Sequence, residues 1–379
     1  MHKKIKCRAA VLFDMGLSRP FAKSKPVKVE EIELDPPGFG EVLVKVAAAG
    51  LCHSDLSVVN GNRPRAMPMV LGHEGSGVIE ELGEGVDDYE IGDHVVFIFV
   101  PSCGKCISCK EGKPALCDPG LAANGAGTLL SGEKKISLNG DLINHQVGVS
   151  CFAEYAVVSS KSLVKVDKSL PLDEAALFGC AVITGAGAVF NTANIKVGST
   201  VAVVGLGGTG LAALMGAKAA GASKIIGIDL LQDKLDLAKQ LGADEVYKAD
   251  DPDILDNIHK FTKGGVHYSF ECVGSEKAME LAYKTLKRGG TVVSSGLSHP
   301  DKSFSIKHVD LVANEKIIKG SFLGSCVPDR DIPAYIDLYR SGRLPVDRLM
   351  SDHITLDEVN EGFDKLSDGN TVRQIISFN

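Results

Sequence analysis

Aromatic residues are scarce in this chain of 379 residues. It contains no Trp, 7 Tyr and 14 Phe, whereas proteins that bind single strands stack the bases on aromatic rings. Positive charge is not concentrated either. The 41 Lys and Arg residues are outnumbered by 48 Asp and Glu residues, which gives a net charge of -7, and no dense block of Lys and Arg occurs. These absences argue against a nucleic acid as a partner.

Long uninterrupted hydrophobic runs are also missing. The longest apolar stretch, residues 200–222, is crowded with glycine and contains Lys218, whereas a membrane span needs about 20 apolar residues with few charges. The apolar run at residues 9–13 is too short for a signal peptide. We therefore expect no membrane partner and a soluble, cytoplasmic protein. The length and the 44% hydrophobic content predict two domains with sizeable cores.

Cysteine is abundant but unevenly spread. Four of the 10 cysteines form the pattern Cys103-x2-Cys106-x2-Cys109-x7-Cys117. Disulfide scaffolds are short and space their cysteines through the whole chain, so disulfides are the weaker interpretation. An iron–sulfur cluster is the competing metal, but the last spacing differs from that of a ferredoxin. Four thiolates close a tetrahedral shell around zinc, so the pattern predicts a structural zinc site.

The periodicity of the chain changes near residue 184. Before it, residues 27–100 hold short β-branched runs bounded by Gly, Pro and Asp, which predict an irregular sheet or small barrel. Residues 101–150 have the composition of a loop. After it, predicted strands at 201–204, 224–228, 266–272 and 290–294 alternate with predicted helices at 211–222, 233–241 and 276–286. This alternation indicates an α/β fold with a parallel sheet. The tail, 325–379, has helical stretches at 331–340 and 356–366 and does not continue the alternation.

A glycine-rich motif follows the first of these predicted strands. It reads Gly205-Leu-Gly207-Gly-Thr-Gly210 and opens a helix, which is the context that makes G-x-G-x-x-G a dinucleotide-binding fingerprint. The helix N-terminus would offer free N–H groups to a pyrophosphate. Asp229 ends the second strand, 19 residues beyond Gly210, where a carboxylate accepts hydrogen bonds from a ribose diol and repels a 2′-phosphate. The motif therefore predicts NAD rather than NADP; a glycine-rich turn without a ligand is the alternative.

A second set of metal-ligand residues is spread along the chain. Cys52-His-Ser-Asp55, Gly72-His-Glu-Gly75 and Phe178-Gly-Cys180 supply two cysteines and one histidine, Cys52, His73 and Cys180. Each alone is more often an ordinary buried or surface residue. Together, two cysteines, one histidine and a water make a catalytic zinc shell whose fourth position takes the substrate oxygen.

These motifs in combination resemble the zinc-dependent medium-chain alcohol dehydrogenases of the long type, which carry a catalytic and a structural zinc. The resemblance covers essentially the whole chain. It implies a GroES-like, β-rich catalytic domain, residues 1–183 and 323–379, and an inserted Rossmann domain with a doubly wound parallel sheet, residues 184–322. The cofactors it implies are NAD and two Zn²⁺ per chain.

The resemblance also implies a role for each matching residue. The implied zinc ligands are Cys52, His73 and Cys180 at the catalytic site and Cys103, Cys106, Cys109 and Cys117 at the structural site. Beside the catalytic zinc, the resemblance implies Asp55 as the carboxylate that orients the histidine, Glu74 as the carboxylate behind the metal, and Ser54 as the hydroxyl that takes the substrate proton. For the coenzyme, it implies Asp229 and Lys234 as adenosine-ribose contacts, His53 and Arg373 as pyrophosphate contacts, Thr184 and Thr209 as neighbours of the nicotinamide, and Gly205, Gly207, Gly208 and Gly210 with Thr209 as the fingerprint. Ser57 stands where the family often has the histidine that ends the proton relay.

The function implied is reversible hydride transfer between a primary aliphatic or aromatic alcohol and NAD. The alternative within the family is the glutathione-dependent formaldehyde dehydrogenase, which resembles the chain at Cys52-His-Ser-Asp55 but carries an Arg at the position of Leu121; residues 119–134 contain none. A non-catalytic relative should have lost zinc ligands, and all seven are present here. The long stretch 118–145 resembles the dimeric branch, so we expect a homodimer, with a tetramer as the alternative.

Overall fold

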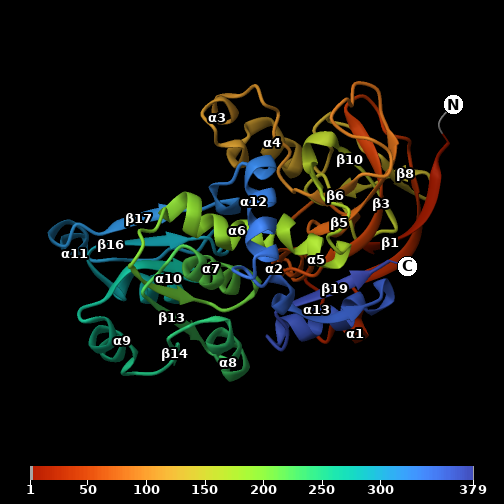
Figure 1. Cartoon of the computed structure of the whole chain (residues 1–379). Coiled ribbons are helices and arrows are strands. Elements are labelled where there is room, and N and C mark those ends of the chain that lie inside the picture. The colour runs from red at the N-terminus through yellow and green to blue at the C-terminus, as the bar shows by residue number, and fades with distance from the viewer. Residues whose placement is uncertain (1–2, 379) are drawn as a thin grey trace. The chain divides into compact units, whose positions relative to one another are not determined.

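The computed structural model describes residues 3–378, and its contacts divide the chain into two compact units. The first unit holds the described residues up to 180, residues 327–332 and those from 350 onward; the second holds residues 181–326 and 333–349. Figure 1 draws the elements of both along the chain. Compared with the boundaries predicted from the sequence, the second unit also takes in 181–183, 323–326 and 333–349. The boundaries of independently folding domains stay a prediction.

Two β-sheets build the first unit. One has the strand order β8-β7-β2-β1-β4-β9; the other has the order β11-β6-β5-β3-β19-β18, with β10 also paired to β3. The strands are β1 Ile5–Leu12, β2 Val27–Leu34, β3 Glu41–Gly50, β4 Met69–Val70, β5 Gly75–Leu82, β6 His94–Phe97, β7 Ile136–Leu138, β8 Asp141–Leu142, β9 Asn144–His145, β10 Tyr155–Ser159, β11 Leu163–Val166, β18 Met350–Ile354 and β19 Arg373–Ser377. The buried side chains of Phe97, Phe152 and Phe363 belong to one core of this unit.

The helices of the first unit are short. They are α1 Phe21–Ser24, α2 His53–Val59, α3 Ile107–Lys110, α4 Asp118–Ala126, α5 Leu172–Ala176 and α13 Val359–Ser367, with short 3-10 helices at Pro114–Leu116, Ser160–Ser162, Leu177–Gly179 and Leu356–Glu358. Strand β19 near the C-terminus pairs with β3, so the end of the chain completes a sheet begun by its first fifty residues. The GroES-like part is therefore formed from both ends of the chain.

A six-stranded parallel sheet forms the second unit. Its order is β14-β13-β12-β15-β16-β17, so the chain moves outward from β12 in one direction and then returns to its other side. The strands are β12 Thr200–Val204, β13 Lys224–Asp229, β14 Glu245–Lys248, β15 Val266–Glu271, β16 Leu286–Ser294 and β17 Ile317–Gly320. Right-handed crossovers place the helices of the two directions on opposite faces of the sheet, which is the doubly wound Rossmann arrangement. The predicted fold class is confirmed.

The helices of the second unit cover this sheet. They are α6 Ala181–Gly187, α7 Gly208–Ala219, α8 Gln232–Leu241, α9 Ile254–Thr262, α10 Glu276–Lys284 and α11 His308–Ala313, with a π-helix at Ala188–Ala193 and 3-10 helices at Leu323–Ser325 and Val346–Leu349. Helix α12, Pro328–Arg340, runs from residues of the first unit into residues of the second. Ile258 and Met279 of α9 and α10 pack on Ala202, Ile226 and their neighbours in the sheet, and Figure 1 shows these helices beside the strands.

The prediction that residues 101–150 form a loop is wrong. This segment contains α3, α4 and β7 to β9. The signals were local and short: Pro119 lies in the first turn of α4, and Gly127 ends the helix in the left-handed conformation, with φ of 70°. Among the described residues, no single helix has the length and hydropathy of a membrane span, although the bent pair Leu172–Gly179 and Ala181–Ala193 reaches both when taken together.

Candidate active site

Three candidate zinc ligands meet inside the first unit. Cys52 caps the N-terminus of α2, His73 lies between β4 and β5, and Cys180 follows the 3-10 helix Leu177–Gly179. Their ligand atoms all lie within 4.8 Å of one another, and all three residues are buried. We call this set the three-ligand cluster. The Sγ of Cys180 is 3.4 Å from Nε2 of His73, so the ring presents Nε2 to this sulfur.

Asp55 orients the histidine. Its Oδ1 lies 2.7 Å from Nδ1 of His73, and its Oδ2 accepts a hydrogen bond from the backbone N–H of Cys52 at 3.0 Å. Burial by itself would lower the pKa of His73, but the charge of Asp55 and its hydrogen bond raise that pKa well above the ordinary value. A ligating histidine typically donates its second ring N–H to such a carboxylate, which leaves the other nitrogen free for a metal.

The thiols of the cluster favour one negative charge between them. A hydrogen bond from the Cys180 thiol and the positive charge of Arg373 lower the pKa of Cys52 well below its ordinary value, against the effect of burial. Hydrogen bonding to Cys52 and burial raise the pKa of Cys180. Thiolates and a neutral imidazole are the donors that zinc prefers, so the three residues fit the metal that the sequence predicts.

Behind the cluster lies a buried pair that sequence patterns did not reveal. Nε of Arg373 is 3.1 Å from Oε1 of Glu74, and both side chains are almost fully buried. Arg373 also donates from Nη1 to the carbonyl oxygen of Leu51 at 3.0 Å. Burial raises the pKa of Glu74 to about 7, although Arg373 opposes that rise. Neither carboxylate oxygen of Glu74 has a hydrogen-bond partner of good geometry among the described residues, and a nearby cation would satisfy such a carboxylate.

The remaining predicted residues of the first unit lie near this cluster in sequence. Ser54 is the second residue of α2 and half-buried, and His53 is its exposed first residue. The hydroxyl of Ser57 donates to the carbonyl oxygen of His53 at 2.7 Å. Phe99 places its ring edge-on to the ring of His73, with the ring centroids 5.4 Å apart.

The four predicted structural ligands also come together. The ligand atoms of Cys103, Cys106, Cys109 and Cys117 lie within 4.8 Å of one another, and we call them the four-cysteine cluster. Backbone N–H groups of Lys105 and Cys106 donate to Sγ of Cys103 at 3.4 and 3.3 Å. These hydrogen bonds lower the pKa of Cys103 to about 6. Four sulfurs this close together could fill all four positions of a tetrahedral zinc shell, as a structural zinc site requires.

The glycine fingerprint has the predicted geometry in the second unit. Gly205 follows β12 with φ of 91°, and Gly207 caps the N-terminus of α7. A Cβ on Gly210 would lie 1.7 Å from the carbonyl oxygen of Gly205, so only glycine lets the helix approach the strand this closely. A Cβ on Gly207 would meet no atom within 4 Å, which leaves open space where a ligand would approach the backbone.

Asp229 is held at the end of β13. Its Oδ2 accepts a hydrogen bond from the N–H of Leu206 at 2.7 Å, and its Oδ1 accepts one from Leu231 at 3.1 Å. Leu206 lies inside the fingerprint, so the carboxylate is tied to the predicted phosphate loop. Lys234 follows on α8 and is half-buried.

Thr184 and Thr209 are carried by neighbouring helices of the second unit. Thr184 lies on α6 and Thr209 on the first turn of α7, and both are half-buried. A Cβ on Gly185 would lie 2.1 Å from the carbonyl oxygen of Thr209. The two helices therefore pack backbone to backbone beside the fingerprint.

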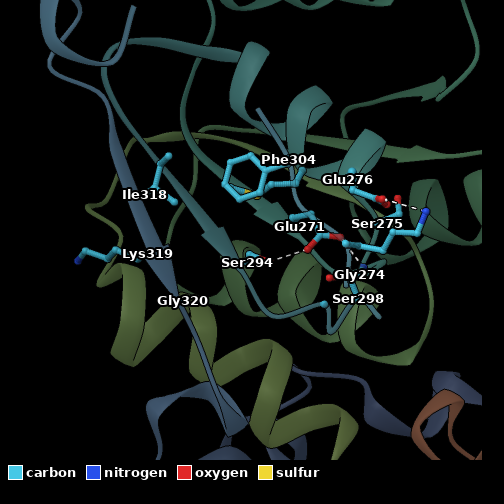
Figure 2. A pocket seen from close by; sticks show the side chains of 13 residues that line it. Glu271, Gly274, Ser275, Glu276, Ser294, Ser298, Phe304, Ile318, Lys319 and Gly320 are labelled. Atoms are coloured by element: carbon cyan, nitrogen blue, oxygen red, sulfur yellow. Dashed lines mark hydrogen bonds and ion pairs between the residues drawn. The ribbon is translucent and has the colours of Figure 1, made fainter. Parts of the chain in front are cut away.

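A separate pocket of about 250 Å³ opens in the second unit, near the ends of β15 and β16. In Figure 2, Glu271 and Ser294 are neighbours in its lining, where Ser294 Oγ donates to Glu271 Oε2 at 2.7 Å. Lys302 reaches Glu276 at 3.4 Å. No predicted coenzyme contact lines this pocket.

Fold and site together define a class of protein: a two-unit oxidoreductase with two metal-ligand clusters and a dinucleotide fingerprint. Comparison with known proteins agrees. Residues 38–168 match the model of the alcohol dehydrogenase GroES-like domain, and residues 208–341 match that of the zinc-binding dehydrogenases. The alcohol dehydrogenase class-3 of Drosophila melanogaster is 38% identical over 382 residues, which cover 99% of this chain and 98% of that protein.

Solved structures extend this comparison. The benzyl alcohol dehydrogenase of Acinetobacter calcoaceticus is 34% identical, with a TM-score of 0.92 over 99% of this chain and 100% of that one. A zinc-binding dehydrogenase from Sinorhizobium meliloti 1021, bound to NADP, is 27% identical, with a TM-score of 0.81 over 99% of this chain and 100% of that one. The chain belongs to the zinc-dependent medium-chain alcohol dehydrogenases, enzymes that use zinc and a nicotinamide coenzyme.

Proposed function

We propose that this enzyme binds two zinc ions per chain and oxidises primary alcohols with NAD. The observation that carries the proposal is the three-ligand cluster, in which two buried sulfurs and an oriented imidazole converge with Glu74 behind them. Three protein ligands leave one coordination position for a substrate oxygen, whereas the four-cysteine cluster leaves none. The first cluster is therefore the catalytic site and the second the structural site.

The chain's own residues position the substrate and move its proton. Asp55 holds the His73 ring by its Nδ1, which keeps Nε2 directed at the sulfurs. Ser54, on the first turn of α2, is the hydroxyl that accepts the alcohol proton. When bound, zinc supplies a Lewis acid for the alcohol oxygen and the nicotinamide ring supplies the hydride acceptor. Because Ser57 stands where the family often has a histidine, and its hydroxyl donates to the carbonyl oxygen of His53, the relay beyond Ser54 differs from one that ends in a histidine.

NAD is the coenzyme that the second unit favours. Gly205, Gly207, Gly208, Thr209 and Gly210 form the loop that receives the pyrophosphate, and Asp229 stands where the adenosine ribose would lie. Lys234 assists at the ribose and Thr184 at the nicotinamide. His53 and Arg373 belong to the first unit, where Arg373 is already engaged by Leu51 and Glu74; their contact with pyrophosphate stays a prediction.

The substrate class follows from the residues around the three-ligand cluster and from the relatives. The Phe99 ring lies against His73, and Ser54 is a small side chain, which together suit aliphatic and aromatic primary alcohols. A relative named for benzyl alcohol supports this choice. S-hydroxymethylglutathione is the alternative substrate, disfavoured by the lack of Arg in residues 119–134.

We also propose a cytoplasmic homodimer. The six cysteines of the two clusters bind zinc as reduced thiolates, which suits a reducing compartment. Within the described sheet of the second unit, β17 pairs on one side with β16, and Ile317 and Ile318 on it are 46% and 37% exposed. An exposed apolar edge strand is satisfied by pairing with a second copy.

The test combines metal analysis with steady-state kinetics. We expect about two zinc ions per chain and NADH formation with ethanol, hexanol and benzyl alcohol. Dependence of the rate on glutathione with formaldehyde, and little rate with the free alcohols, would instead select the formaldehyde dehydrogenase. A chain without bound zinc would refute the enzyme assignment of both clusters.

A further inference from the structure

A tight turn lies against the segment that carries His73. In this turn, residues 146–150, the carbonyl oxygen of Gln146 accepts hydrogen bonds from the N–H groups of Val149 and Ser150, at 3.0 and 3.4 Å. The N–H of Gln146 donates to Oγ of Ser150, and that hydroxyl donates to the carbonyl oxygen of Val70, both at 2.8 Å. Val147 and Ser150 have φ of 44° and 56°, values that non-glycine residues seldom adopt and that a β-branched residue such as Val147 adopts only when its surroundings enforce them.

The turn and the residue after it hold both backbone groups of Gly72. The N–H of Gly72 donates to Oε1 of Gln146, and the carbonyl oxygen of Gly72 accepts from the N–H of Cys151 at 3.1 Å. Gly72 has φ of 101°, and a Cβ there would lie 2.3 Å from the backbone nitrogen of Phe152. The backbone of Gly72 therefore packs directly against residues 151–152, and its conformation is fixed by these contacts.

Gly72 directly precedes His73, so its peptide sets the direction from which the imidazole enters the cluster. Asp55 and Phe99 contact the ring itself and do not hold the backbone. Gln146 is 3% exposed, so water cannot replace its carbonyl oxygen as acceptor for the Gly72 N–H. A buried donor without an acceptor drives the backbone to rearrange.

We propose that Gln146 is a positioning residue for the three-ligand cluster: its side-chain carbonyl holds the Gly72 peptide so that His73 meets Cys52 and Cys180. This inference rests on the proposed function, because it takes the cluster to bind zinc. Gln146 is 74 residues from Gly72 in sequence, and its Oε1 accepts from the backbone beside a ligand rather than from a ligand. Its effect on the metal is therefore transmitted by the backbone.

The experiment follows zinc loss from the purified, zinc-loaded enzyme into an excess of a chelating dye. Gln146→Leu removes the acceptor at similar volume. We expect the zinc of the three-ligand cluster to be released about tenfold faster, because removing a hydrogen bond that supports a metal ligand typically weakens metal binding by this much or more. Gln146→Glu keeps a side-chain oxygen for the Gly72 N–H and should stay within about threefold of the parent. Loss at the parental rate in Gln146→Leu would overturn the proposal.

Asn360→Leu is the matched control. Asn360 is a buried amide of the same unit that accepts from the N–H of Val27 at 3.3 Å and donates to its carbonyl oxygen at 2.8 Å, far in sequence from the cluster. It should lower thermal stability and leave zinc release unchanged; equal acceleration in both variants would mean general loosening and overturn the proposal.

A second readout separates geometry from stability. In enzyme loaded with Co²⁺, the visible absorption bands report ligand geometry, and they should shift in Gln146→Leu but not in Asn360→Leu. If Gln146→Leu does not fold, Ser150→Ala, which removes the hydroxyl that ties the turn to Val70, should give a smaller shift in the same direction; unchanged bands would overturn the proposal. A parent that binds no zinc at the cluster refutes the proposed function instead.

Discussion

Replacing Asp229 with Gly should weaken the preference for NAD over NADP. The carboxylate accepts hydrogen bonds from the N–H groups of Leu206 and Leu231, and an ionised carboxylate has further acceptor sites that we propose for the adenosine ribose. A 2′-phosphate there would meet a fixed negative charge. Two unit charges 4 Å apart interact by about 1 kcal/mol in water and about 4 kcal/mol at an effective dielectric constant of 20.

This range corresponds to a preference of roughly 5- to 900-fold, because about 1.4 kcal/mol is a factor of ten. We expect at least about tenfold in kcat/KM in favour of NAD for the parent. Asp229→Gly should reverse part of this ratio, since it removes the charge and frees two backbone N–H groups to donate to the phosphate. The preference should also shrink as ionic strength rises.

The assay measures kcat/KM for NAD and for NADP with one alcohol at fixed pH and ionic strength. Asp236→Asn is the control, because it removes one carboxylate from the helix that follows Asp229, where Asp236 is exposed and accepts from Gln232 at 2.8 Å. Equal kcat/KM for the two coenzymes in the parent would refute the reasoning. An equal change of the ratio in Asp236→Asn would show that net charge, not the site, decides it.

Three further outcomes are expected. Cys180→Ser should abolish turnover and leave a folded chain with one bound zinc. Cys106→Ser should instead lower the midpoint of thermal unfolding, because structural zinc contributes to folding. If Cys106→Ser lost only kcat and kept its stability, the catalytic and structural sites would be reversed. Burial and neighbouring lysines lower the pKa of His145 to about 3, so the unfolded chain takes up this proton first. The free energy of unfolding should therefore fall as pH drops below about 6.5, by about 2 kcal/mol between pH 7 and 5. His145→Gln should reduce this loss of stability in thermal melts recorded against pH, and an unchanged loss would mean that His145 is not the titrating group. Light scattering should give twice the mass of one chain, and a mass of four chains would select the tetramer.

The buried position of His145 explains the sign of that pH effect. Its Nε2 accepts the backbone N–H of Lys135 at 3.0 Å, so the neutral form is the one the fold stabilises. A protonated ring would turn this acceptor into a second donor beside the positive charge of Lys134 and Lys135. A glutamine at this position would keep an acceptor without titrating, which is why His145→Gln isolates the proton from the packing.

Local sequence determined two of the sites of this protein and the topology of its parallel sheet. The four-cysteine cluster and the glycine fingerprint are each contained in short segments, so spacing alone specifies their geometry. The alternation of buried strands and helices after residue 184 likewise determined the parallel sheet, because each βαβ unit is local and its crossover has one favoured hand. Cys52, His73 and Cys180 were found by their residue types and by resemblance to a family, since more than a hundred residues separate the first from the last.

Tertiary structure decided the rest. The pairing of Glu74 with Arg373, the hold of Gln146 on Gly72 and the closing of a sheet by β19 join residues between 74 and about 330 positions apart. No local pattern encodes such contacts, because the partner of a buried polar group is set by whichever distant segment the packing brings against it. Residues 101–150 differ from these contacts: Pro119 and Gly127 mark α4 locally, but elements this short have no periodic hydrophobic face and depend on tertiary packing for their stability.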